Sequence, residues 1–77
     1  MKDHFVVGRA ERQSLMERAN RDGIPVKLRD GSVMRGTVSG VANPFASVVV
    51  RTALGDLSYE YSWATIREVL DSGRELQ

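Results

Sequence analysis

The stretch IPVKLRDGSVMRGTV, residues 24–38, predicts a β-hairpin whose second strand contains a glycine. Aliphatic and β-branched residues flank the turn sequence at 29–31, Arg-Asp-Gly, a pattern typical of a tight connection between antiparallel strands. Gly36 lies inside the second strand, where a glycine weakens pairing unless the backbone bends or approaches another group closely. We therefore predict that Gly36 is a structural bend, at which a long strand coils to serve both halves of a small barrel.

The sequence around this hairpin predicts one helix and further short strands. Residues 9–21 are rich in helix-forming side chains and contain neither glycine nor proline, and Gly23 supplies a stop just after them. Turn sequences then separate runs of alternating apolar residues. We expect strands at 26–28, 32–41, 45–52, 57–62 and 65–70. The predicted fold is mainly β, with an N-terminal helix followed by a strongly bent, five-stranded antiparallel small barrel.

Length and composition limit the chain to one small domain. We divide its 77 residues into a flexible leader at 1–8, a single domain at 9–70 with its barrel at 24–70, and a polar tail at 71–77. There is no cysteine, and the only histidine is His4, so disulfides and multi-histidine metal sites within one chain are excluded. A core this small is marginal alone, which favours self-assembly as extra support.

Charge and hydropathy narrow the class of function. Residues 1–37 hold eight Lys or Arg against five Asp or Glu, a net of +3, whereas residues 38–77 hold three against five, a net of −2. A basic half can face a polyanion, although a solvated helix surface explains the same charges. Neither a membrane-spanning run nor a signal peptide is visible, so we expect a cytoplasmic protein. We find no catalytic constellation and expect no enzyme activity, metal or cofactor.

Two segments resemble the signatures of the Sm-like family. The first comprises I24-P25-V26-K27-L28 with D30-G31, M34, G36, V38, V41 and F45, and the second comprises Y61-S62-W63-A64 with I66 and V69. The chain is most similar to the bacterial RNA chaperone Hfq, in which an N-terminal helix also precedes the first strand. The resemblance implies a small barrel of the SH3 type that assembles into a ring of six or seven identical subunits, each pairing its fourth strand with a neighbour's fifth.

The resemblance also implies a function, which is binding of single-stranded RNA around the pore, as an RNA chaperone or regulator. Matching positions place Asn43 and Phe45 in one pore loop and Ser62 and Trp63 in the other. An amide can read a base edge and an aromatic ring can stack on a base. The helix could add cations at a ring face. The expected RNA-binding residues are Asn43, Phe45, Ser62, Trp63, Arg12, Arg18 and Arg21, and the expected subunit-interface residues are Tyr59, Tyr61, Trp63 and Ile66.

Several positions leave alternatives open. The chain has Ser62-Trp63 where Hfq has a lysine-histidine pair, so its RNA contacts should be less electrostatic. Phe45 could instead plug the barrel end, and Trp63 could seal the subunit contact. The alternative function is a protein-interaction or structural module built on the same small barrel without nucleic acid, and DNA binding is a third option.

Overall fold

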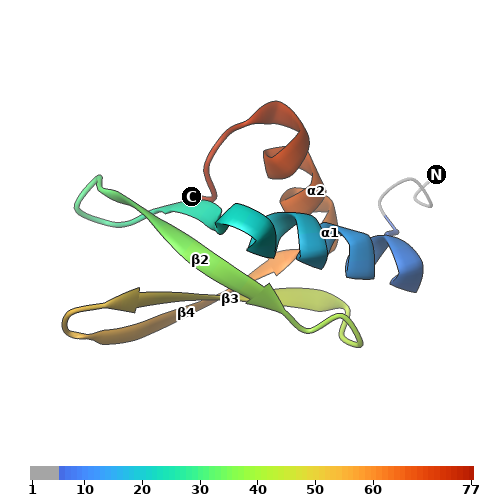
Figure 1. Cartoon of the computed structure of the whole chain (residues 1–77), viewed down its shortest axis with the longest axis horizontal. Coiled ribbons are helices and arrows are strands. Elements are labelled where there is room, and N and C mark those ends of the chain that lie inside the picture. Colours follow the sequence, from blue (N-terminus) through green and yellow to red (C-terminus); the bar gives the residue numbers. More distant parts are fainter. Residues whose placement is uncertain (1–5) are drawn as a thin grey trace.

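The computed structural model describes residues 6–77 and shows an α+β domain. Helix α1 (Arg9–Asp22) is followed by four strands, β1 (Ile24–Lys27), β2 (Val33–Ser39), β3 (Phe45–Thr52) and β4 (Gly55–Ser62), and then by helix α2 (Trp63–Ser72). The strands form one antiparallel sheet in the order β1-β2-β3-β4. Figure 1 shows both helices on the same side of this sheet. The predicted N-terminal helix and antiparallel meander are confirmed.

The core lies between the helices and one face of the sheet, which we call the inner face. Alternate residues of the strands point inward because successive side chains of a strand lie on opposite faces. The buried apolar side chains of this core are Leu15 and Ala19 from α1, Ile24, Val26, Val38, Ala46, Val48 and Val50 from the sheet, Trp63, Ile66 and Val69 from α2, and Val7 and Leu76 from the segments before α1 and after α2. The opposite, outer face of the sheet carries polar and charged side chains together with Val33, Phe45 and Val49.

Strand β2 changes partner at Gly36. Its first half pairs with β1, its second half pairs with β3, and Gly36 lies opposite both Ile24 and Val50. The β1–β2 and β3–β4 hairpins therefore leave this point separately, and Figure 1 shows their tips splayed apart. The inner side of Gly36 is filled, since a Cβ there would lie 2.8 Å from Cγ1 of Val48 and 3.3 Å from Cγ2 of Val26.

The side chain of Asn20 completes β2 beyond this point. Its Nδ2 donates to the carbonyl oxygen of Val38 at 2.9 Å, and its Oδ1 accepts from the Val38 N–H at 2.8 Å. In an antiparallel sheet, the N–H and C=O of a given residue both point towards the same neighbouring strand. The amide of Asn20 therefore takes the place that a longer β1 would fill, and it ties the last turn of α1 to the sheet.

The predicted closed barrel at 24–70 and its fifth strand at 65–70 are wrong. The sheet has four strands and does not close, and residues 63–72 form α2. The hydroxyl of Ser62 accepts from the N–H of Thr65 at 3.1 Å, which is an N-cap, and Gly73 ends the helix in the left-handed conformation. Residues 63, 66 and 69 recur at helical spacing, so their side chains share the buried face of α2.

The segment after α2 returns to the sheet instead of fraying. Leu76 is 1% exposed and forms a parallel bridge with Val26. Its N–H donates to the carbonyl of Pro25 at 2.9 Å, and its carbonyl accepts from the N–H of Lys27 at 2.7 Å. The expected polar tail thus contributes one residue to the core and covers the edge of β1 that does not pair with β2.

We expect Gly36→Ala to lower the free energy of unfolding by about 1–3 kcal/mol, because the new methyl group overlaps Val48. Adding Val48→Ala opens space for this methyl group, so the double variant should lose about 1 kcal/mol less than the two single losses together. Urea denaturation measures all three variants. Gly8→Ala is the control for an added Cβ without overlap, since a Cβ at Gly8 has no neighbour within 4 Å, and any loss there reports only the change of N-cap of α1. Additive losses would contradict the close packing at Gly36.

We expect Asn20→Ala to cost roughly 1–3 kcal/mol, because it leaves both polar groups of Val38 without their partner. Asn20→Asp should cost more at pH 7, since a carboxylate then faces the Val38 carbonyl. That contact raises the pKa of the introduced carboxyl in the folded state, so the extra loss should shrink as the pH falls towards 4. Thermal denaturation from pH 7 to pH 4 measures this. Gln13→Ala removes an amide bonded only to Glu17 and should change little. Equal stability of the Ala and Asp variants at every pH would contradict the paired geometry.

Candidate functional site

The loop between β2 and β3 brings several of the predicted RNA-binding residues together. Phe45, which begins β3, lies opposite Ser62 at the end of β4. The indole Nε1 of Trp63 donates to the carbonyl oxygen of Asn43 at 3.1 Å. Two segments that are about 20 residues apart in the sequence therefore meet at one end of the sheet. We call the exposed part of this region, Asn43, Pro44 and Phe45, the loop end.

Trp63 and Arg12 lie behind the loop end and hold it. The Trp63 side chain is 3% exposed, so its ring packs in the core, and only its N–H reaches the loop. The guanidinium of Arg12 donates from Nε to the carbonyl of Val41 at 2.6 Å and from Nη1 to the carbonyl of Val7 at 2.8 Å. Both side chains were predicted to contact RNA, and the structure shows them bound to backbone carbonyls of their own chain.

The residues of the loop end face outward. Phe45 is 53% exposed on the outer face of the sheet, and Asn43 and Pro44 are exposed in the loop itself. The loop has a turn of its own, in which the N–H of Asn43 donates to the carbonyl of Gly40 at 2.9 Å. Ser62 is half-buried, and its hydroxyl caps α2. The loop end therefore presents an aromatic face and a free side-chain amide on a fixed backbone.

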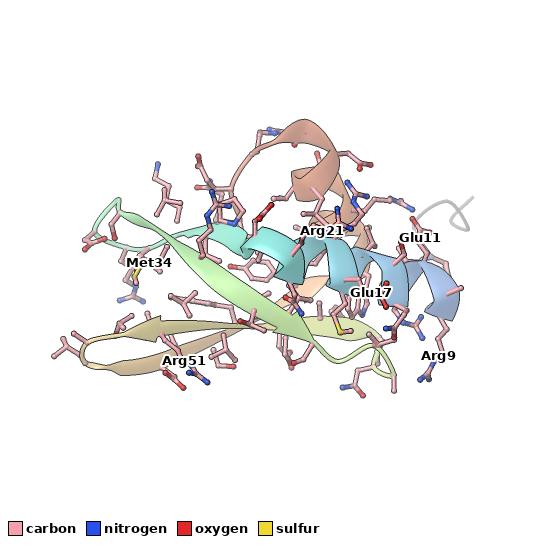
Figure 2. The ribbon with its side chains drawn as sticks, viewed as in Figure 1. Arg9, Glu11, Glu17, Arg21, Met34 and Arg51 are labelled. Carbon is pink, nitrogen blue, oxygen red and sulfur yellow. The ribbon has the colours of Figure 1, made fainter. Side chains whose placement is uncertain are left out.

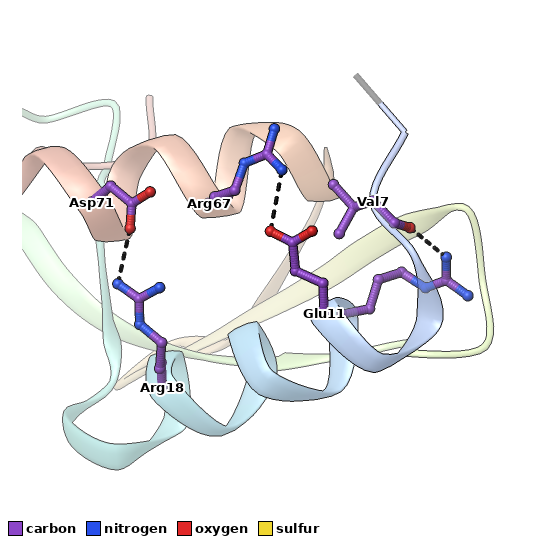
Figure 3. A network of polar contacts seen from close by, with 6 residues as sticks. Val7, Glu11, Arg18, Arg67 and Asp71 are labelled. Atoms are coloured by element: carbon purple, nitrogen blue, oxygen red, sulfur yellow. Dashed lines mark hydrogen bonds and ion pairs between the residues drawn. The ribbon is translucent and has the colours of Figure 1, made fainter. Parts of the chain in front are cut away.

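The other two predicted helix cations lie away from the loop end. Arg18 forms a salt bridge with Asp71 of α2 at 3.0 Å, and Arg67 of α2 forms one with Glu11 at 3.1 Å. Figure 3 shows these two pairs joining the helices, with the contact between Arg12 and Val7 beside them. Arg21 is exposed in the last turn of α1, nine residues after Arg12, which places it about 13 Å along the helix axis.

Arg9 is a cation that the sequence reasoning missed. It is exposed in the first turn of α1, and Figure 2 shows its side chain pointing away from the body of the protein. It precedes Arg12 by three residues, so both lie on neighbouring positions of one helix surface, at the end that contacts Val41. Within residues 6–77, Arg9 forms no salt bridge. The three-residue spacing of the two arginines is the signal that could have found it.

The predicted interface residues divide between the core and the inner face. Ile66 is fully buried, as Trp63 is, whereas Tyr59 and Tyr61 are half-buried on β4 with ring centroids 6.3 Å apart. The Tyr61 hydroxyl donates to the carbonyl of Gln77 at 3.2 Å. Burial raises the pKa of the Tyr61 phenol, and the neighbouring Tyr59 raises it further. Only the two tyrosines therefore offer any surface for contact with another molecule.

A cleft lies at the other end of the sheet, between the splayed tips of the β1–β2 and β3–β4 hairpins. This cleft has a volume of about 770 Å³ and is lined on its apolar side by Leu28, Met34, Leu54, Leu57 and Tyr59. Leu54 is fully exposed and Leu57 is 40% exposed. Sequence reasoning treated residues 54–56 only as a turn. Leu54 within that turn and Leu57 directly after it were the available signal, because a hairpin tip does not need apolar residues.

Neither a cluster of metal-ligating side chains nor a membrane-spanning helix is found among residues 6–77. Residues 6–77 contain no group of three or more His, Cys, Asp or Glu side chains placed to hold a metal ion. His4, the only histidine, lies outside the described residues. Across that same part of the chain, neither helix has the length and hydropathy to span a bilayer.

Comparisons with known proteins leave the family open. A scan of the sequence against models of protein families finds no match. A search of curated proteins and a search of solved structures find none either. An N-terminal helix followed by a four-stranded antiparallel sheet is compatible with an Sm-like fold and is not specific to it.

Proposed function

We propose that this domain binds single-stranded RNA at the loop end, with Arg9 as the accompanying cation. Phe45 stacks on a base, the Asn43 amide hydrogen-bonds a base edge, and Arg9 contacts a phosphate. The observation that carries the proposal is the fixed loop, which is bonded from behind by Trp63 and Arg12 while its own side chains stay exposed. Holding a loop in place before binding lowers the entropic cost of ordering it in the complex.

The chemistry of the loop end favours a single strand over a duplex. An aromatic side chain can stack on a base only where that base is already unpaired or easily splayed out. The loop end carries one aromatic ring and one amide, and the nearby cations are few. Binding should therefore depend more on stacking than on phosphate contacts, and its salt dependence should be shallow.

The ring of six or seven subunits that the Sm-like resemblance implies remains part of this proposal. A ring would repeat the loop end around a pore and turn weak individual contacts into useful affinity. In that family the fourth strand of one subunit pairs with the fifth strand of its neighbour. Here residues 65–70 belong to α2, so a ring would have to form through a contact other than this strand pairing. RNA binding at a single loop end does not depend on ring formation.

A protein-interaction module is the second candidate, and the observation that favours it is the apolar cleft beside β4. The exposed Leu54 and Leu57 adjoin Leu28, Met34 and Tyr59 around this cleft, and a contiguous apolar surface is typical of an interaction site. The cleft and the loop end lie at opposite ends of the β3–β4 hairpin, so the two functions do not compete for the same residues.

We expect Phe45→Ala to weaken binding of a fluorescein-labelled, single-stranded U-rich or A-rich RNA by roughly tenfold, because it removes the stacking surface. Fluorescence anisotropy at low salt measures the dissociation constant, and the same sequences made as DNA test the choice of sugar. Leu54→Ala is the matched control, since Leu54 is also exposed and lies at the other end of the hairpin. Equal effects of the two variants, or no binding by the unaltered protein, would rule out the loop end as an RNA site.

A further inference from the structure

We infer that the open edge of β4 and the adjoining cleft form a docking site for an extended segment of another protein, with apolar residues alternating with lysine or arginine. The segment would add to the sheet as a fifth strand beside β4. This inference develops the second candidate function and does not rest on RNA binding. It concerns the free edge of β4, which contains none of the loop-end residues Asn43, Pro44 and Phe45.

The backbone of β4 has bonding capacity left on one side. β4 is eight residues long and lies at the edge of the sheet, so every second residue presents its N–H and C=O away from β3. Proteins usually protect such an edge with proline, charged side chains (lysine above all), a bulge or a covering segment. Strand β4 contains no proline or lysine, and its register with β3 is continuous from Gly55 to Ser62 without a bulge.

The side chains on the inner side of β4 lead into the cleft. Leu57 and Tyr59 both line it, and both are only partly covered by the rest of the chain. A strand added beside β4 would place every second side chain on this same side. Those positions need apolar residues, because they would lie against Leu57, Tyr59 and the exposed Leu54.

The side chains on the outer side of β4 are acidic. Asp56 and Glu60 are exposed there, and neither forms a salt bridge within the described part of the chain. Arg51 lies opposite Asp56 on β3, whereas Glu60 lies opposite Ser47 and has no cross-strand cation. Opposite charges on neighbouring strands stabilise pairing, so the outward positions of an added strand need lysine or arginine.

The same charges disfavour a second copy of this chain as the occupant. Two β4 strands paired about a two-fold axis would gather four carboxylates on one face, and centring the pair on Ser58 would set Asp56 directly opposite Glu60. Pairing β4 of one copy with the opposite edge of the next requires β1. That edge contains Pro25, which has no N–H, and it is already bonded to Leu76.

Peptide binding to the full chain tests the inference. The probe is a fluorescein-labelled, nine-residue peptide of alternating valine and lysine with both termini blocked, and the comparison peptide has glutamate in place of lysine. Fluorescence anisotropy measures both affinities for the unaltered protein and for the Asp56→Lys/Glu60→Lys variant. Glu17→Lys/Asp22→Lys on α1 is the control, because it changes the net charge equally at exposed sites away from β4.

We expect the valine-lysine peptide to bind and the valine-glutamate peptide to bind much more weakly. The β4 double variant should lose about tenfold in affinity for the first peptide and gain affinity for the second, while the helix control keeps the original preference. Amide hydrogen exchange should slow at residues 55–62 when the first peptide is bound. Light scattering should give the same mass for the unaltered protein and the β4 double variant, because no second copy of the chain occupies this edge.

Other results would overturn the inference. Equal binding of the two peptides, no binding at millimolar peptide, or the same response in the helix control would remove the role of Asp56 and Glu60. Slowed exchange confined to residues outside β4 would place the peptide elsewhere. An assembly that the β4 double variant dissociates would show that copies of this chain occupy the edge.

Discussion

The structure depends on the pair of hydrogen bonds that joins the side chain of Asn20 to the backbone of Val38. Strand β1 begins at Ile24, directly after α1, and therefore stops short of the second half of β2. The N–H and C=O of Val38 would be left without a partner there, at a cost comparable to losing a hydrogen bond for each. By filling this gap, Asn20 lets one strand serve two hairpins. It also fixes α1 over the part of β2 that leads into the loop end.

Secondary structure was predicted correctly in the segments whose local sequence pattern is compatible with only one kind of element. The Asp-Gly turn at 30–31, the alternating residues of 45–52 and the helix-forming run at 9–21 each led to the correct element. Residues 63–72 were misassigned because Ile66, Val69 and Leu70 favour a strand by composition alone. The N-cap of Ser62 on Thr65 and the helical spacing of the apolar residues were the competing signals. The closed barrel failed with that strand, because its closure needed five strands and the sheet has four.

The sequence was enough to locate the candidate site in the chain, but the side-chain contacts that build it were not predictable. The loop after β2 could be located from Asn43-Pro44, and its exposed aromatic residue follows directly. The roles of Trp63 and Arg12 depend on contacts across 20 and 29 residues of sequence. Whether an arginine faces solvent or donates to a buried carbonyl is decided by which backbone groups the tertiary fold leaves unpaired. Residue type alone does not carry that information.

The two edge strands of the sheet differ, because β1 is covered by the C-terminal residues whereas the edge of β4 is open. The last residues turn back to cover β1, where Leu76 buries its side chain and bonds on both sides of Val26. Among the described residues, no buried side-chain nitrogen or oxygen lacks a hydrogen-bond partner. A chain able to close one edge in this way is not forced by its small size to leave the other open. The exposure of β4, with its leucines on one side and unpaired acids on the other, is therefore better explained by a partner than by incomplete packing.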